Sequence, residues 1–144
     1  MEKIKAYGVC LYKYTNDSVR VLLCKSTNSN ERWGFLKGVA TAHEEPVDTA
    51  IREFKEECNI DVTKEDLENF YIQKNEYKNI GIYLVNANKI EDLDKYFDNE
   101  ILLKENLSSE NTDVEFFDIN NMPLIKKKQK NLTAEILEFF KSKI

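Results

Sequence analysis

The sequence has few cysteines, no long apolar run and no excess of basic residues, and each absence excludes a class of protein. Its three cysteines, Cys10, Cys24 and Cys58, lie at apolar pattern positions. Their odd number and placement indicate reduced, buried thiols rather than a disulfide framework. No run of about 18 apolar residues occurs, and no apolar signal stretch follows Met1. We therefore expect a soluble, cytoplasmic protein without a membrane partner.

The charge and the length narrow the class further. A formal net charge of −5 in 144 residues excludes a basic protein that holds long nucleic acids by their phosphates. We expect no DNA partner, and the charge also disfavours RNA. The run Lys126 to Lys128, with Lys130, is interpreted as a solubilising surface. A chain of this length without a composition break predicts one domain, residues 1–144, and nothing in it indicates an oligomeric state.

The segment that starts at Pro46 has the pattern of an amphipathic helix. Its apolar residues recur at helical spacing; they are Val47, Ala50, Ile51, Phe54 and Cys58. Glu53, Glu56 and Glu57 share an arc beside this apolar stripe, because residues three and four apart stack on one helix surface. Like charges repel there unless a cation that prefers oxygen ligands sits among them. We therefore predict a bound Mg²⁺, with Mn²⁺ as a possible substitute.

A wider pattern surrounds this helix. Gly38 is followed by Glu44 and then by the run REFKEECNI, which starts at Arg52 and ends at Ile60. The stretch resembles the Nudix box of the Nudix hydrolase superfamily, and the preceding WGFLKG resembles the usual lead-in to that box. The resemblance implies a Nudix fold and hydrolysis of a pyrophosphate bond.

Three residues depart from the usual box. Asn59 stands where the pattern has Gly, but Asn is the side chain that best tolerates a left-handed conformation, so the helix can still end there. Leu36 replaces a frequent Pro, and His43 replaces a frequent Gly. Both changes alter loop stiffness. We expect them to affect the fit of the substrate more than catalysis.

The remaining patterns indicate alternating strands and helices. Strands are predicted at 6–14 and 19–25, joined as a hairpin by a turn, and at 33–35, 70–75, 80–85 and 114–119. Gly38 is expected in a loop. Helices are predicted from Pro46 onward, at 90–97 and, after Pro123, at 124–143, while 99–111 has no clear period. The fold class is therefore α/β: a Nudix-like α/β/α sandwich with a mixed β-sheet between helices.

The resemblance also implies roles for the residues of the box. The expected metal-binding groups are the carbonyl of Gly38 and the carboxylates of Glu53, Glu56 and Glu57. Glu53 is the leading candidate for the general base, although the base varies between subgroups of the family. Arg52 is expected to orient a catalytic carboxylate, with an ordinary helix salt bridge as the alternative. Glu44 is expected to be a metal ligand or to support one.

Further candidates lie outside the box. Glu110 precedes the last strand, a place where many Nudix enzymes offer one more carboxylate, and Glu115 is its rival. Lys37 and Lys78 are candidates for contacts with substrate phosphates. Tyr83 could stack on a nucleobase, although a place in the core is slightly favoured.

These features predict a Mg²⁺-dependent hydrolase that cleaves a pyrophosphate bond in a nucleoside diphosphate linked to another moiety. A loose resemblance to asymmetric diadenosine tetraphosphate hydrolases favours a dinucleoside polyphosphate as the small nucleotide substrate. A (d)NTP pyrophosphatase that cleans the nucleotide pool and an RNA 5′-pyrophosphohydrolase are the alternatives. A noncatalytic Nudix-fold module that binds a nucleotide is disfavoured, because such domains typically lose box carboxylates and all four are present here.

Overall fold

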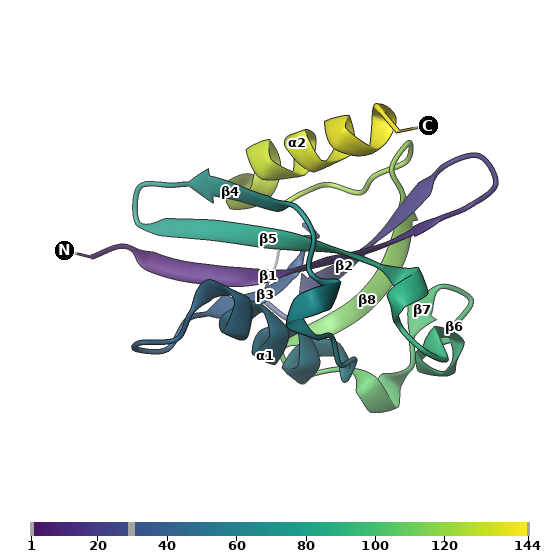
Figure 1. Ribbon diagram of the computed structural model, residues 1–144, viewed down its shortest axis with the longest axis horizontal. Helices are drawn as coiled ribbons and strands as arrows, with labels where there is room; N and C mark the ends of the chain where they lie inside the picture. The colour runs from purple at the N-terminus through teal and green to yellow at the C-terminus, as the bar shows by residue number, and fades with distance from the viewer. Residues whose placement is uncertain (1, 29–30, 144) are drawn as a thin grey trace.

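One mixed β-sheet is the central layer of this protein (Figure 1). The computed structural model describes residues 2–28 and 31–143. In this part of the chain the sheet consists of β1 (Ile4–Tyr14), β2 (Val19–Ser26), β3 (Leu36–Val39), β4 (Phe70–Lys74), β5 (Lys78–Asn86), β6 (Phe97–Asp98), β7 (Ile101–Leu102) and β8 (Asn111–Asp118).

The strand order is β4-β5-β1-β2-β8-β7-β6, and β3 pairs with β1. The β1–β5 pair is parallel, and the other paired strands are antiparallel. β1 pairs with β2 only next to their turn, where Tyr12 lies opposite Val21, and with β3 farther along, where Tyr7 lies opposite Gly38. The register therefore places Gly38 within the sheet, beside its central strand.

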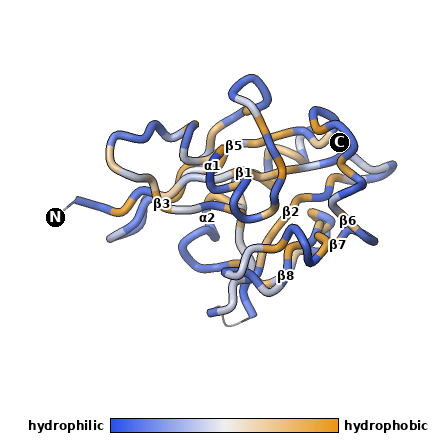
Figure 2. Tube along the Cα trace, turned by 90° about the horizontal axis from the view of Figure 1, so that it is seen from below, coloured by the Kyte–Doolittle hydropathy of each residue, from blue (hydrophilic) through white to orange (hydrophobic). Residues whose placement is uncertain are grey.

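Two helices cover opposite faces of this sheet. Figure 1 shows α1 (Pro46–Cys58) on one side and α2 (Lys130–Lys141) on the other. Phe54 of α1 is fully buried in the core of one face, and Phe140 of α2 is fully buried in the core of the other. Figure 2 shows hydrophobic residues along the central strands that separate these two cores. The predicted α/β/α sandwich with a mixed sheet is confirmed.

The local signals at α1 are confirmed as well. Pro46 lies in its first turn, where the missing N–H group costs nothing. Asn59 ends the helix in the left-handed conformation, with φ of 66°, and its N–H group donates to the carbonyl of Lys55 at 2.8 Å. His43 has φ of 67°, so two positions where the Nudix pattern has Gly keep the backbone conformation that Gly favours.

Three element predictions are wrong in their bounds. β3 begins at Leu36 rather than Trp33, and Gly38 lies in this strand rather than in a loop. The last helix begins at Lys130 rather than Leu124, because the preceding segment bonds to the backbone of Trp33 instead. The segment 90–97 contains no α-helix in the described chain, but the 3₁₀ turn Leu93–Tyr96 and the first residue of β6. Segment 99–111, which shows no clear period, includes the short strand β7 and the 3₁₀ turn Lys104–Asn106.

Two further observations concern the cysteines and the lengths of the helices. Cys10, Cys24 and Cys58 are free and buried, as predicted. None of the helices in the described residues has the length and apolar character needed to cross a bilayer.

Candidate active site

Arg52 joins three carboxylates into one cluster. Its Nη1 donates to Oε2 of Glu53 and to Oε2 of Glu56, both at 2.8 Å. Its Nε and Nη2 donate to the two oxygens of Glu44 at 2.9 and 3.0 Å, and Nη2 also reaches the Val39 carbonyl at 3.2 Å. Because a guanidinium is a planar fork of five donors, this single side chain fixes the positions of all three carboxylates. The arrangement favours the orienting role over an ordinary helix salt bridge.

Glu44 is fully engaged by protein donors. Besides Arg52, it accepts hydrogen bonds from the backbone N–H and hydroxyl of Thr41, at 3.1 and 3.2 Å, and from the hydroxyl of Thr49 at 2.8 Å. These donors stabilise the charged form, with Arg52 the largest contributor, and hold the pKa of Glu44 well below its usual range. Of its two expected roles, the geometry favours support of Arg52 over metal binding.

Glu53 lies directly against the backbone of Gly38. A Cβ atom at position 38 would come within 1.9 Å of the Glu53 carboxyl carbon, so only Gly leaves room for this carboxylate. Burial raises the pKa of Glu53, and the hydrogen bond from Arg52 opposes that rise. The strand, the helix and the arginine therefore fix one partly buried carboxylate beside the Gly38 backbone.

Glu57, one turn farther along α1, is buried with only 5% of its surface exposed. Its Oε1 accepts a hydrogen bond from Nδ2 of Asn111 at 3.0 Å and a longer one from the Cys24 thiol at 3.9 Å. Its Oε2 is buried and has no hydrogen-bond partner. Burial raises the pKa of Glu57 to about 7, opposed by the Asn111 hydrogen bond and the charge of Lys37. An orphaned buried carboxylate oxygen is costly unless a cation or proton occupies it.

The two rival carboxylates outside α1 occupy different surroundings. Glu110 precedes β8, and its charge raises the pKa values of both Glu53 and Glu57, so it belongs to their electrostatic neighbourhood. Glu115 lies within β8, where burial and Asp113 raise its pKa. The structure therefore brings Glu110, rather than Glu115, toward the carboxylates of α1.

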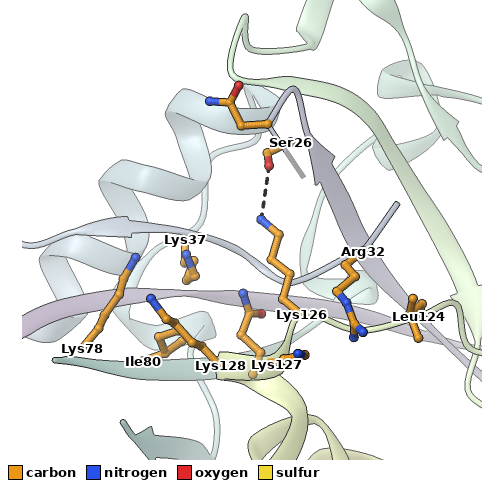
Figure 3. Close-up of a pocket in the computed structure, with 11 residues that line it drawn as sticks. Ser26, Arg32, Lys37, Lys78, Ile80, Leu124, Lys126, Lys127 and Lys128 are labelled. Atoms are coloured by element: carbon orange, nitrogen blue, oxygen red, sulfur yellow. Dashed lines mark hydrogen bonds between the residues drawn. The ribbon is translucent and has the colours of Figure 1, made fainter. Parts of the chain in front are cut away.

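Lys37 and Lys78 line a cavity of about 850 Å³ on the sheet face opposite α1 (Figure 3). Lys126, Lys127 and Lys128 line the same cavity. The interpretation of this run as a plain solubilising surface is therefore corrected. No pattern in the sequence links a lysine run before the last helix to a lysine in β3, because the two segments meet only in the folded sheet.

Tyr83 does not line this cavity. It lies on the α1 side of the sheet, where its ring packs 4.6 Å from that of Phe70, between ring centroids. Burial raises its pKa, with a further contribution from Tyr7. This placement favours the core interpretation over a base-stacking role.

Comparison with known proteins identifies the family. The NUDIX domain family model matches residues 4–139. The chain belongs to the Nudix family. The sequence matches no curated protein.

Solved Nudix structures share this fold at low sequence identity. An Ap4A hydrolase of C. elegans in a binary complex has a TM-score of 0.62 at 19% identity and covers 96% of each chain. A NUDIX hydrolase of Nitrosomonas europaea has a TM-score of 0.69 at 18% identity, and the match covers 99% of this chain and 72% of the other chain. An ADP-ribose pyrophosphatase of Streptococcus suis has a TM-score of 0.57 at 16% identity, and the match covers 94% of this chain and 90% of the other chain. The prediction of a Nudix pyrophosphohydrolase is confirmed at the level of the family.

Nudix hydrolases generally use divalent metals, usually Mg²⁺, and the donor set of this chain fits such an ion. The Gly38 carbonyl and the carboxylates of Glu53, Glu56 and Glu57 are the hard oxygen donors that Mg²⁺ prefers. The orphaned Oε2 of Glu57 is the atom that most needs a cation. Within the described residues no three carboxylates lie close enough together to hold a metal ion, and Arg52 bonds two of them, Glu53 and Glu56.

Proposed function

We propose that this Nudix protein is a Mg²⁺-dependent hydrolase that cleaves a pyrophosphate bond in a nucleoside diphosphate linked to another moiety. The observation that carries the proposal is the buried, unpartnered Oε2 of Glu57 next to the Arg52-bound carboxylates. A purely structural glutamate would have both oxygens satisfied, since an unpaired buried oxygen destabilises the fold by about 1 to 3 kcal/mol. The arrangement supports a site shaped for a cation rather than a noncatalytic module.

The reaction needs an aligned water, neutralisation of phosphoryl charge and a proton acceptor. Gly38, Glu53, Glu56 and Glu57 would hold the ion, which would neutralise charge on the phosphoryl oxygens and acidify water. The water oxygen bonds to phosphorus, the bridging P–O bond breaks, and the leaving phosphate keeps the bonding electrons. Glu53 takes the proton of the water, and burial raises the pKa of Glu53, which makes its carboxylate a stronger base.

The supporting carboxylates have separate tasks in this scheme. Arg52 holds Glu53 at 2.8 Å and so orients the base, while Glu44 fixes the guanidinium from the other side. Glu110 adds negative charge near Glu53 and Glu57, which strengthens their attraction for a cation. Glu110 is therefore the proposed further catalytic carboxylate. We also propose that Mn²⁺ can replace Mg²⁺ at this site.

For the substrate we propose a dinucleoside polyphosphate such as diadenosine tetraphosphate. Its hydrolysis would give ATP and AMP, whereas a (d)NTP pyrophosphatase would release a monophosphate and pyrophosphate. The cavity lined by Lys37 and Lys78 supports a strongly anionic substrate. The same cavity weakens the argument against RNA from net charge, so RNA with a 5′-triphosphate belongs in the test.

The test is a panel of substrates with Mg²⁺, with products identified by mass. The panel contains dinucleoside polyphosphates, (d)NTPs, nucleotide sugars and 5′-triphosphorylated RNA. Glu53→Gln should abolish most turnover, whereas Glu135→Gln, an equal charge change on the exposed side of α2, should leave it unchanged. No hydrolysis of any substrate would refute the enzyme assignment. A preference for dNTPs of about a hundredfold in kcat/KM, near 2.7 kcal/mol, would refute only the dinucleoside preference.

A further inference from the structure

The lysine-lined cavity is built from three separate parts of the chain. Lys37 comes from β3, Lys78 from the start of β5, and Lys126 to Lys128 from the segment before α2. Figure 3 shows the amino groups of Lys37, Lys78 and Lys128 turned to the same side, with Lys126 reaching toward Ser26. Its volume of about 850 Å³ falls in the range of ligand sites.

The backbone that carries the lysine run is fixed against β3 and its lead-in. The N–H group of Trp33 donates to the Leu124 carbonyl at 2.8 Å, and the N–H group of Lys126 donates to the Trp33 carbonyl at 2.9 Å. Buried Gln129 then accepts a hydrogen bond from the N–H group of Phe35 at 2.8 Å. Its amide fills the space beside Gly34, where a Cβ atom would come within 2.5 Å of Nε2.

The same backbone is held from the other side by β4 and the turn that follows. The side chain of Gln73 donates to the Lys127 carbonyl at 3.4 Å, and that of Asn75 donates to the Lys128 carbonyl at 3.1 Å. These contacts hold the backbone of two residues that line the cavity. The run is therefore part of a preorganised wall rather than a mobile surface tail.

The cavity concentrates positive charge, and its described lining residues include no carboxylate. Within residues 2–28 and 31–143, none of its five lysines forms an ion pair. Burial and the charges of Lys128 and Lys126 lower the pKa of Lys78. An anion in the cavity would relieve this repulsion.

The chemistry of the lining distinguishes between the parts of a nucleotide. Among the described residues the lining includes no aromatic ring on which a base could stack, and its apolar members are Ile80 and Leu124. Lys37 also connects the cavity to the carboxylates, since its neighbour in β3, Gly38, lies directly against the Glu53 carboxyl. The cavity therefore suits phosphate groups that continue from a scissile bond at Glu57, and the base would lie elsewhere.

We propose that the cavity of Lys37, Lys78 and Lys126 to Lys128 binds a chain of three or more contiguous phosphates, so that the enzyme prefers long polyphosphate substrates over diphosphate ones. The preference rests on the proposed function, but the binding does not. Charge-assisted hydrogen bonds from several lysines accumulate with the number of phosphates, whereas a diphosphate lying at the metal site leaves the cavity empty.

Binding is tested without catalysis. Inorganic tripolyphosphate, pyrophosphate and orthophosphate are titrated calorimetrically into the full chain in metal-free buffer. Tripolyphosphate should bind at least tenfold more tightly than pyrophosphate, and Lys127→Ala with Lys128→Ala should weaken it about a hundredfold, or tenfold per lysine. The matched control is Lys74→Ala with Lys130→Ala, two exposed lysines outside the cavity. Equal binding of the three anions, or equal loss in both double variants, would overturn the proposal.

Turnover tests the preference. With Mg²⁺, kcat/KM for diadenosine tetraphosphate should exceed that for ADP-ribose, and the Lys127/Lys128 double variant should lower the first about a hundredfold and the second less than threefold. Equal losses on both substrates would overturn the chain-length preference and leave the hydrolase assignment standing. An enzyme inactive on every substrate would instead overturn the proposed function, and the tripolyphosphate titration then decides the cavity alone.

Discussion

Replacing Glu57 by Gln should stabilise the metal-free protein, and increasingly so as the pH rises. Glu57 is buried, and its pKa is about 7 in the folded protein against an ordinary value of 4.5. The folded state therefore binds this proton more tightly than the unfolded state does. The resulting stabilisation is fully present below about pH 4.5 and is lost as the pH rises through 7.

The magnitude follows from the difference between the two pKa values. At about 1.36 kcal/mol per pKa unit, a rise from 4.5 to about 7 corresponds to about 3 kcal/mol. Gln has nearly the same shape and keeps an oxygen for the Asn111 hydrogen-bond donor, but it carries no charge at any pH. The stability difference between Glu57→Gln and the parent protein should therefore grow by about 2 to 3 kcal/mol between pH 5 and pH 8.5.

Urea unfolding of metal-free protein at these two pH values measures this difference. In thermal melts, the same change corresponds to roughly 5 to 10 °C in Tm. Glu56→Gln is the matched control. The substitution removes the same formal charge, but the Glu56 side chain is 55% exposed. Its stability difference from the parent should stay nearly constant over this range.

The reasoning would be refuted by a Glu57→Gln difference that does not change with pH. Such a result would mean that Glu57 is solvated or paired in solution. Excess Mg²⁺ provides a second check, because an ion at the orphaned Oε2 stabilises the charged carboxylate. The pH dependence of the parent protein should therefore become shallower with Mg²⁺, while that of the Glu57→Gln variant should not.

Four further predictions concern the same site. Glu57→Gln should abolish most turnover while circular dichroism shows an intact fold, and a variant that loses both would indicate a structural glutamate instead. Gly38→Ala should lower activity at least tenfold, because its Cβ atom would displace the Glu53 carboxyl; steady-state kinetics with unchanged activity would contradict this close approach. Asn111→Leu should destabilise the protein by about 1 to 3 kcal/mol in urea and weaken Mg²⁺ binding measured by calorimetry, since Oε1 of Glu57 loses its donor; unaltered Mg²⁺ affinity would argue against a positioning role. Tyr83→Phe and Tyr83→Ala should both leave KM within about threefold if the ring serves the core, whereas a tenfold rise for Ala alone would restore the base-stacking hypothesis.

Local patterns in the sequence were enough to predict α1 and its ends. The apolar spacing places Phe54 in the core, Pro46 fits the first turn, and Asn59 adopts the left-handed conformation that closes the helix. Each of these features depends on residues within one or two turns of each other. The family could be recognised for the same reason, because its box is a contiguous stretch.

Competing long-range hydrogen bonds explain where the local patterns failed. The helical spacing that begins at Leu124 is genuine, but Trp33 takes the backbone groups of Leu124 and Lys126. A helix there would leave those groups of Trp33 without partners. Such a contact joins residues about ninety positions apart, and no local pattern contains it.

The sequence by itself determined the family, the sandwich fold and the carboxylates that line one side of α1. Only the tertiary structure decided how deeply each carboxylate is buried and which groups it contacts. The strand that carries Asn111 covers Glu57, whereas its neighbour Glu56 faces solvent, so adjacent glutamates of one helix differ in burial, and burial raises the pKa of Glu57. In the same way, Lys37 and Lys126 share a cavity because strand pairing brings them together. Burial and charge density depend on such distant contacts, which the order of residues encodes only through the complete fold.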